Sequence, residues 1–322
     1  MKREEILKNK KLIKRFCKDN NLPINVYEEP YFTQRLAILD EIFDCEFAFR
    51  TFVKELEAFE NEQEYFEHYN AVKDAVITHI KSHPKFQEFN EMKTDYPKPA
   101  YGSRDFYKMP LNEKHIISID MKKANFTALS RFSKDIFLGA DTWEEFMGKF
   151  TGLQNLIRSK YVRQVIMGAC NPKRQVAYEK YLMTMLLEEI LPKLEGLEVY
   201  SLSNDEIILV PDTETKEFSF DVFEEVTKAV KETEYADMVR VSVFHLEKLP
   251  VTDGWKREIY YDRASYDSPE LRKHYHHPYD FKKLSADYYH QIVKAYRNEH
   301  ITGDDLVIYH DGRLARLLNP IL

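Results

Sequence analysis

Apolar residues recur at helical spacing through the first part of the chain. Spacings of three and four residues predict an apolar stripe along one helix face. The stripe consists of Phe32, Leu36, Leu39, Phe43 and Phe47. A second helix is expected over "NEQEYFEHYNAVKDAVITHI", closed by Pro84. The connector "DYPKPAYGSRDFYKMP" gathers prolines and a glycine, so we predict a helical N-terminal domain over residues 1–97.

The pattern changes after residue 98. The β-branched run from Ile116 to Ile119 is typical of a central strand. "NPKRQVAYEKYLMTMLLEEIL" predicts a helix capped by Asn171, with Pro172 in its first turn. "LEVYSLSNDEIILV" predicts two strands around a polar turn at 203–205, and "MVRVSVFHL" predicts another strand.

The order of these elements is strand, helices, paired strands, helix, strand, which is that of a ferredoxin-like split unit. We therefore expect an α+β domain over residues 98–250, with an antiparallel sheet and helices on one face. Right-handed connections place the first strand beside the hairpin, so Asp120 and Asp205 are expected to meet at one edge. Residues 251–322 are expected to form a small aromatic-rich α+β part. It would hold a helix over "SADYYHQIVKAYRNEH" and a β-hairpin turning at Asp311-Gly312.

Composition and charge limit the class of protein and the cellular compartment that we expect. The chain has 322 residues, 43% hydrophobic residues and a net charge of -7, and it holds no apolar run near the ~18 residues of a membrane span. Three cysteines are too few and too scattered for a disulfide framework or a zinc site. We expect a soluble, non-secreted protein of the reducing cytoplasm that binds no membrane. Lys and Arg are concentrated in the first eighteen residues, which is a local basic patch in an acidic chain.

Two carboxylates on one sheet edge indicate a cation, because like charges repel unless a divalent ion lies between them. Mg²⁺ prefers oxygen ligands and binds one or two carboxylates together with substrate phosphates. Two ions about 4 Å apart would clamp both oxygens of a phosphoryl transfer. We expect Asp120 and Asp205 as metal ligands and Glu206 as an assisting acid. The cations expected to bind a nucleoside triphosphate are Arg158, Lys160, Arg163, Lys173 and Arg174.

Three segments resemble a known family. "SIDMKKANFTAL" is similar to the first palm motif of reverse-transcriptase-like polymerases, an apolar strand ending in Asp. "SNDEIILV" resembles the acid-turn hairpin of the palm, and its Asn-Asp-Glu is close to the His-Asp-Glu of bacterial-type repair polymerases. "RQVIMGACNP" resembles the segment with a Gln, a Gly and a Pro before a helix. The resemblance covers residues 115–250. It implies a polymerase-type palm that uses Mg²⁺ or Mn²⁺, nucleoside triphosphates and a DNA or RNA partner.

The sequence departs from that family at two positions and leaves other readings open. The second motif shows Asp-Glu where reverse transcriptases have Asp-Asp. Asn125 stands where they place an aromatic residue that excludes the ribose 2′-hydroxyl, so the choice of sugar stays open and Asn125 is a candidate to bind the nucleotide through a sugar hydroxyl. Alternatively, Asp120 caps a helix starting near Met121 and Asp205 only forms a turn. The chain would then be an inert palm-like protein that binds nucleic acid or a partner, or a regulatory domain that binds a small nucleotide.

Overall fold

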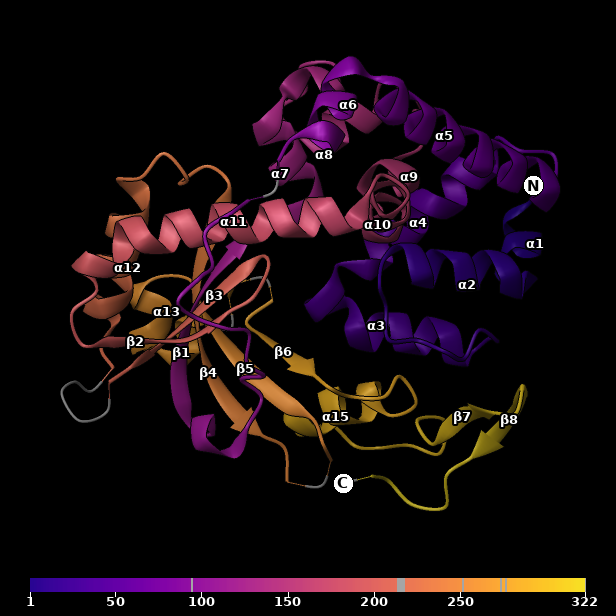
Figure 1. Cartoon of the computed structure of the whole chain (residues 1–322). Coiled ribbons are helices and arrows are strands. Elements are labelled where there is room, and N and C mark those ends of the chain that lie inside the picture. Colours follow the sequence, from indigo (N-terminus) through magenta and orange to yellow (C-terminus); the bar gives the residue numbers. More distant parts are fainter. Residues whose placement is uncertain (94, 213–217, 251, 273, 276, 322) are drawn as a thin grey trace.

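A six-stranded antiparallel sheet forms the centre of the molecule (Figure 1). The computed structural model describes residues 1–93, 95–212, 218–250, 252–272, 274–275 and 277–321. The strand order is β2-β3-β1-β4-β5-β6. The strands are β1 (Lys114–Met121), β2 (Leu197–Leu202), β3 (Glu206–Pro211), β4 (Val239–Lys248), β5 (Trp255–Tyr260) and β6 (Tyr279–Lys282). A separate hairpin joins β7 (Val307–His310) to β8 (Arg313–Arg316) through the predicted turn.

Helices surround the sheet in three groups. The first six helices are α1 (Arg3–Lys8), α2 (Lys10–Asp19), α3 (Tyr31–Phe43), α4 (Cys45–Leu56), α5 (Glu62–Ser82) and α6 (Pro84–Glu91). Between β1 and β2 lie α7 (Ala124–Phe132), α8 (Trp143–Met147), α9 (Gln154–Arg158), α10 (Lys160–Gly168) and α11 (Pro172–Ile190). The remaining helices are α12 (Phe220–Lys231), α13 (Arg263–Asp267), α14 (Pro269–Arg272) and α15 (Tyr289–Tyr296). Short 3-10 turns occupy Met109–Leu111, Lys134–Phe137 and Leu191–Lys193.

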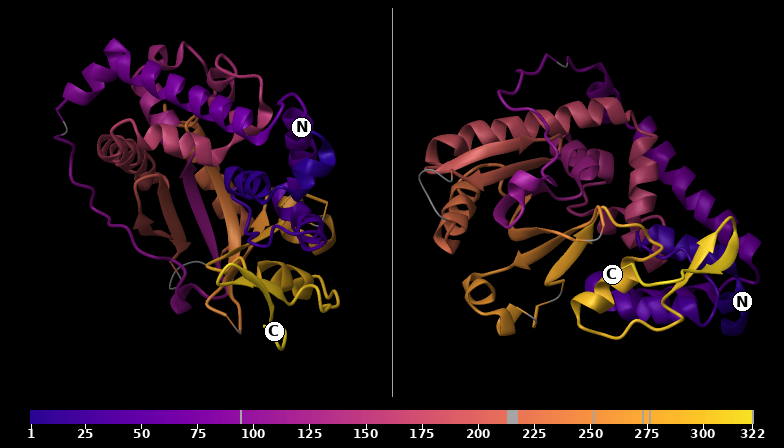
Figure 2. Two further views of the ribbon diagram at one scale, coloured as in Figure 1. Left: turned by 90° about the vertical axis from the view of Figure 1, so that its right-hand side faces the viewer. Right: turned by 90° about the horizontal axis from the view of Figure 1, so that it is seen from below.

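Alternation along β1 gives the sheet two unlike faces, because successive side chains of a strand point to opposite sides. Ile117, Ile119 and Met121 are buried in a core with residues of α11 and α12, and we call this side the helix face. Ser118 and Asp120 point to the other side, which we call the open face. Figure 2 shows α11 on one side of the sheet and α2 and α3 on the other. The N-terminal helices therefore lie on the side of the open face.

A second core joins the N-terminal helices to later parts of the chain. It includes buried residues of α1 to α6, of α7 to α10, and of the segment 279–293. The N-terminal helices therefore pack with segments that lie beyond the expected limits at residues 97 and 250. The sheet also crosses residue 250, because β5 pairs with β4 and β6 pairs with β5.

Most expected elements are present, with local corrections. The strand at 116–119, the hairpin around 203–205 and the strand near 239–248 are confirmed as β1, β2–β3 and β4. The helix ending before Pro84 is also confirmed. Asn171 is the N-cap residue of α11 and Pro172 opens the helix, as expected, but the Asn171 side chain makes no capping hydrogen bond and donates to Asn90 at 2.7 Å instead.

The expected apolar stripe ends early. Asp44 adopts a left-handed φ of 49°, which ends α3 and starts α4 in a new direction. Phe47 is consequently 65% exposed, while Phe49 is buried. Among the described residues, no helix combines the length and apolar character needed to cross a membrane.

Candidate active site

Acidic residues gather where β1 ends. Asp120 lies opposite Glu206 of β3 on one side and opposite Arg240 of β4 on the other. The backbone N–H of Met121 donates to the carbonyl oxygen of Asp205 at 2.7 Å, which fixes the hairpin turn beside the end of β1. The structure therefore brings Asp120, Asp205 and Glu206 together, as the order of elements predicts.

Asp120 is a strand residue and does not cap a helix. The next helix, α7, begins at Ala124, and its N-cap position is Lys123. The capping alternative for Asp120 is therefore wrong. Its carboxylate points from the open face, remains 36% exposed, and pairs with the exposed guanidinium of Arg240 at 3.4 Å.

Burial and neighbouring carboxylates raise the pKa values of Asp120 and Glu206. Burial raises the pKa of Asp120, Arg240 opposes that change, and the Asp205 carboxylate adds to it. Burial also raises the pKa of Glu206, and the Ser118 hydroxyl, which donates to it at 2.6 Å, lowers it in part. Two such carboxyl groups share a site that favours either a proton or a cation, because either one relieves the repulsion between like charges.

A cleft of about 760 Å³ opens over these acids. One wall is the open face of the sheet, and the other includes Pro23, Ile42 and Phe43 from the N-terminal helical part. Asp120 and Glu206 line one part of the sheet wall. The volume lies within the ~300–1,000 Å³ range typical of small-molecule sites.

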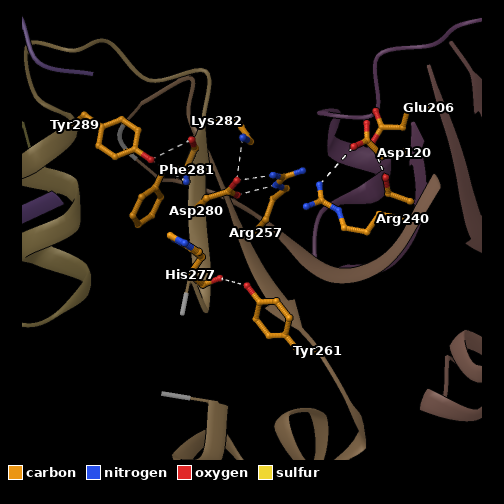
Figure 3. A network of polar contacts seen from close by, with 11 residues as sticks. Asp120, Glu206, Arg240, Arg257, Tyr261, His277, Asp280, Phe281, Lys282 and Tyr289 are labelled. Carbon is orange, nitrogen blue, oxygen red and sulfur yellow. Dashed lines mark hydrogen bonds and ion pairs between the residues drawn. The ribbon is translucent and has the colours of Figure 1, made fainter. Parts of the chain in front are cut away.

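A basic cluster lines the same cleft at β5 and β6 (Figure 3). Arg257 donates from Nε to Asp280 at 2.7 Å and makes a second hydrogen bond to it. Lys282 pairs with Asp280 at 2.9 Å. Burial lowers the pKa of Lys282, and the charges of Arg257 and Lys160 lower it further. Two cations thus share a single carboxylate, which leaves this end of the cleft positive, whereas Asp120 and Glu206 make the other end negative.

Of the five cations expected to bind triphosphate, only Lys160 has a described electrostatic link to the acids. It is exposed at the start of α10, and its charge lowers the pKa of Asp120. The charge of Arg158 lowers the pKa of Glu55 of α4 in part. Burial lowers the pKa of the partly buried Arg163, and the Glu144 carboxylate opposes that change.

The other two expected cations lie on α11, near the N-terminal part. Arg174 donates to the backbone oxygen of Met92 and lies over the ring of Phe89. Lys173 is exposed in the first turn of α11. The described contacts of Arg174 therefore direct it to the helical part rather than to the acids.

Two further polar residues lie behind the hairpin turn. The Asn125 amide donates to Glu179 of α11 at 2.7 Å. Burial and the Asp205 carboxylate raise the pKa of Glu179 to about 7, and the hydrogen bond from Asn125 lowers it in part. Glu179 thus extends the acidic group to the helix side of the sheet.

Four polar residues near the site were not predicted from the sequence, although two of them stand out in the pattern of their helix. Gln175 and Glu179 lie one turn apart in the stripe that Leu182, Leu186 and Ile190 continue, so two polar residues occupy core positions of a helix. Arg257 and Asp280 lie in two short strands with many charges, and only their pairing across the sheet shows their relation.

The donor set suits a hard cation of the Mg²⁺ type, since it consists of carboxylate oxygens and a neighbouring serine hydroxyl. Within the described ranges, no group of three or more His, Cys, Asp and Glu side chains is arranged as metal ligands. An ion here would be held by Asp120 and Asp205, with its other ligands from water and from substrate phosphates.

Comparison with protein-family models, curated proteins and solved structures gives no match to this chain. The geometry of the site therefore carries the functional argument by itself.

Proposed function

We propose that this protein is a palm-type nucleotidyltransferase or nucleic-acid polymerase that uses nucleoside triphosphates and Mg²⁺ or Mn²⁺. The observation that carries the proposal is the meeting of Asp120 with Asp205 and Glu206 at the end of β1, where Asp120 and Glu206 line an open cleft that is basic at its other end. A negative end suits a cation, and a positive end suits phosphates, which are the two components of a metal–triphosphate substrate.

The sheet supports the palm assignment. Four of its strands lie in the order β4-β1-β3-β2, and the chain visits them as β1, helices, β2, β3, α12 and β4. This order is the one expected of a ferredoxin-like unit. The helices α11 and α12 contribute to the core on one face, and on the other face the strand ends with Asp120 and Glu206 border the cleft, which supports a substrate site there.

Each polar residue has a role in this proposal. Asp120 and Asp205 hold the divalent ion, which when bound neutralises phosphate charge and acidifies an attacking hydroxyl. Glu206, held by Ser118, orients the metal ligands. The triphosphate is bound by Lys160 from α10 and by Arg257 and Lys282 from the sheet. The products are an acceptor extended by one nucleotide and pyrophosphate.

An incorporation assay tests the proposal. The intact protein is given labelled ribo- or deoxyribonucleoside triphosphates, Mg²⁺ or Mn²⁺, and single-stranded or primed acceptors. We expect incorporation, and we expect Asp120→Asn and Asp205→Asn to reduce it ~100-fold or more, since each removes a metal ligand. Glu198→Gln is the matched control, because Glu198 is an exposed acid on β2 of the same hairpin. Unchanged incorporation by Asp120→Asn would refute the proposal.

Two observations favour a second candidate, an inert palm-like protein that binds nucleic acid or another partner. Arg240 already pairs with Asp120, and the motif after the turn is Asp-Glu rather than Asp-Asp. An inert protein would bind nucleic acid equally well with and without a chelator, and Asp205→Asn would not change its affinity. Metal-independent binding fits both candidates, so the incorporation assay separates them: the inert protein would incorporate no nucleotide, whereas the enzyme would incorporate nucleotide and lose that activity in Asp205→Asn.

A further inference from the structure

A second, smaller pocket lies between α2 and α10 and borders the cleft. It has a volume of about 350 Å³, and we call it the α2–α10 pocket. Asn21 lines both this pocket and the cleft that holds Asp120. The two cavities therefore adjoin at Asn21, so a chain-like ligand in the α2–α10 pocket would lie next to the cleft.

The pocket combines an apolar floor with basic sides. Leu22 and Ile24 are buried below it, and the exposed Lys14 and Lys18 of α2 line it. Tyr161 of α10 forms part of the opposite wall. The amine of Lys18 lies 4.3 Å from the centre of the Tyr161 ring, and the Arg15 guanidinium lies 4.4 Å from it. This arrangement concentrates positive charge beside an aromatic and apolar surface.

Buried hydrogen bonds hold the two walls together. The side chain of Asp19, at the end of α2, is fully buried and pairs with Arg15 at 2.7 Å. The hydroxyl of Ser159, the N-cap residue of α10, donates to the Asp19 carboxylate at 3.2 Å. The hydroxyl of Tyr69 donates to the same carboxylate at 3.1 Å. The pocket is thus a preformed feature, because its walls are joined through a buried polar network.

We infer that the α2–α10 pocket binds one nucleotide of a single-stranded nucleic acid on its way to the cleft. The basic side chains suit backbone phosphates, and the apolar floor suits the face of an unpaired base. A duplex would not offer a base to such a floor, since its bases are stacked and paired. The volume is at the small end of the ~300–1,000 Å³ range of ligand sites, which fits one nucleotide at a time. The inference rests on the proposed function for the role of the cleft at the end of this path.

Fluorescence anisotropy with a labelled single strand of about twelve nucleotides tests the inference, with chelator present so that metal plays no part. The test variant is Lys14→Gln with Lys18→Gln. Each lost phosphate contact lowers the salt slope by about 0.7 for single strands, so we expect a fall of about 1.4 and ~10-fold weaker binding. The matched control is Lys10→Gln with Lys11→Gln, which removes the same charge from α2 outside the pocket, where Lys10 pairs with Glu28 and Lys11 with Glu62. The control is expected to stay within about twofold of the parent.

Three results would overturn the inference. A control that loses as much affinity as the test variant would mean that affinity follows overall charge. An abasic strand of equal length that binds as tightly as the normal strand would show that no base contacts the apolar floor. An oligoglutamate peptide that competes as well as an oligonucleotide would assign the pocket to an acidic peptide.

Binding and incorporation are separate measurements, so the two proposals fail separately. Loss of incorporation with the binding pattern intact would remove the catalytic proposal and leave the pocket as a nucleic-acid site. If incorporation persists but the lysine variants bind as tightly as the parent, only the inference about the α2–α10 pocket is refuted. A comparison of Tyr161→Leu with Tyr161→Phe tests the role of the aromatic wall. Only the leucine variant loses the ring that lies beneath the two cations. We therefore expect only the leucine variant to bind the single strand more weakly.

Discussion

The two faces of the central sheet are built from the same strands and differ in what they carry. On the helix face, β1 and β3 contribute Ile119, Ile207 and Leu209 to an apolar core. On the open face, the same strands contribute Asp120 and Glu206, and the neighbouring strands contribute Arg240 and Arg257 to the cleft wall. The helix face stabilises the fold, whereas the part of the open face that borders the cleft places like charges together at a cost in stability. The rest of the open face is apolar, because Ile116, Ile208 and Phe244 are buried there in a further core. The polar part is therefore confined to the strand ends that line the cleft, where we expect a ligand.

The first prediction contrasts neighbouring residues of β1. Ile119→Ala should lower the free energy of unfolding by about 3–4 kcal/mol, because it leaves a cavity in a fully buried position. Asp120→Asn should not lower it, because the substitution removes a charge whose pKa burial and Asp205 have raised. Urea denaturation measures both. The comparison breaks down if Asp120→Asn destabilises the protein as much as Ile119→Ala does.

The second prediction concerns Glu179 and pH. Its pKa is raised from 4.5 to about 7, so the folded state holds the proton more tightly than the unfolded chain. Stability should therefore fall as pH rises from about 4.5 to 7, by up to about 3 kcal/mol in total, and remain lower above pH 7. Glu179→Gln mimics the protonated acid and should remove that loss.

Thermal or urea unfolding at pH 5 and pH 8 checks this second prediction. The Gln variant should be more stable than the parent at pH 8 and nearly equal to it at pH 5. Glu189→Gln, an exposed acid on the same helix, serves as the control and should leave the pH dependence unchanged. Equal pH profiles for the parent and Glu179→Gln would show that Glu179 titrates normally.

The third and smallest effect is expected for Arg240. Its pair with Asp120 is exposed on the arginine side, so Arg240→Gln should change stability by less than about 1 kcal/mol. The substitution removes a cation that competes for the Asp120 carboxylate, so the affinity for Mn²⁺ should rise a few-fold. An electron paramagnetic resonance titration of free Mn²⁺ gives that affinity.

Arg263→Gln is the matched control for Arg240. Arg263 is also an exposed arginine in ion pairs, but its partners are Asp221 and Glu224 of α12. It should leave Mn²⁺ binding unchanged. Mn²⁺ affinity that stays the same or falls in Arg240→Gln would argue that the ion does not bind at Asp120.

Sequence patterns predicted the part of the fold in which local signals agree with packing. Alternation or apolar runs mark β1, β3 and β4, and the polar turn at 203–205 marks the hairpin, so the meeting of Asp120 with Asp205 follows from chain order. β5 and β6 were missed because their charged residues break the apolar pattern. Arg257 and Asp280 satisfy each other only after the strands pair.

The expected basic residues show a different limit. Arg158, Arg163 and Arg174 lie between the two acids in sequence. Yet Arg158 and Arg163 interact electrostatically with Glu55 and Glu144, and Arg174 donates to the backbone oxygen of Met92. Nearness in sequence does not tell which side of a short helix faces a cleft, since α9 and α10 also pack against the N-terminal helices. The expected position of Phe47 was wrong because Asp44 adopts a left-handed backbone conformation that changes the direction of the chain. Such a conformation is usually marked in a sequence by glycine, and no glycine is present there.

A crystal soaked with Mn²⁺ and a nucleoside triphosphate tests the central claim most directly, because anomalous scattering locates the ion. We expect an anomalous peak bound by the carboxylates of Asp120 and Asp205, with the phosphates reaching toward Lys160, Arg257 and Lys282. A nucleotide bound in the cleft with no peak beside Asp120, and with that carboxylate still paired to Arg240, would contradict the account.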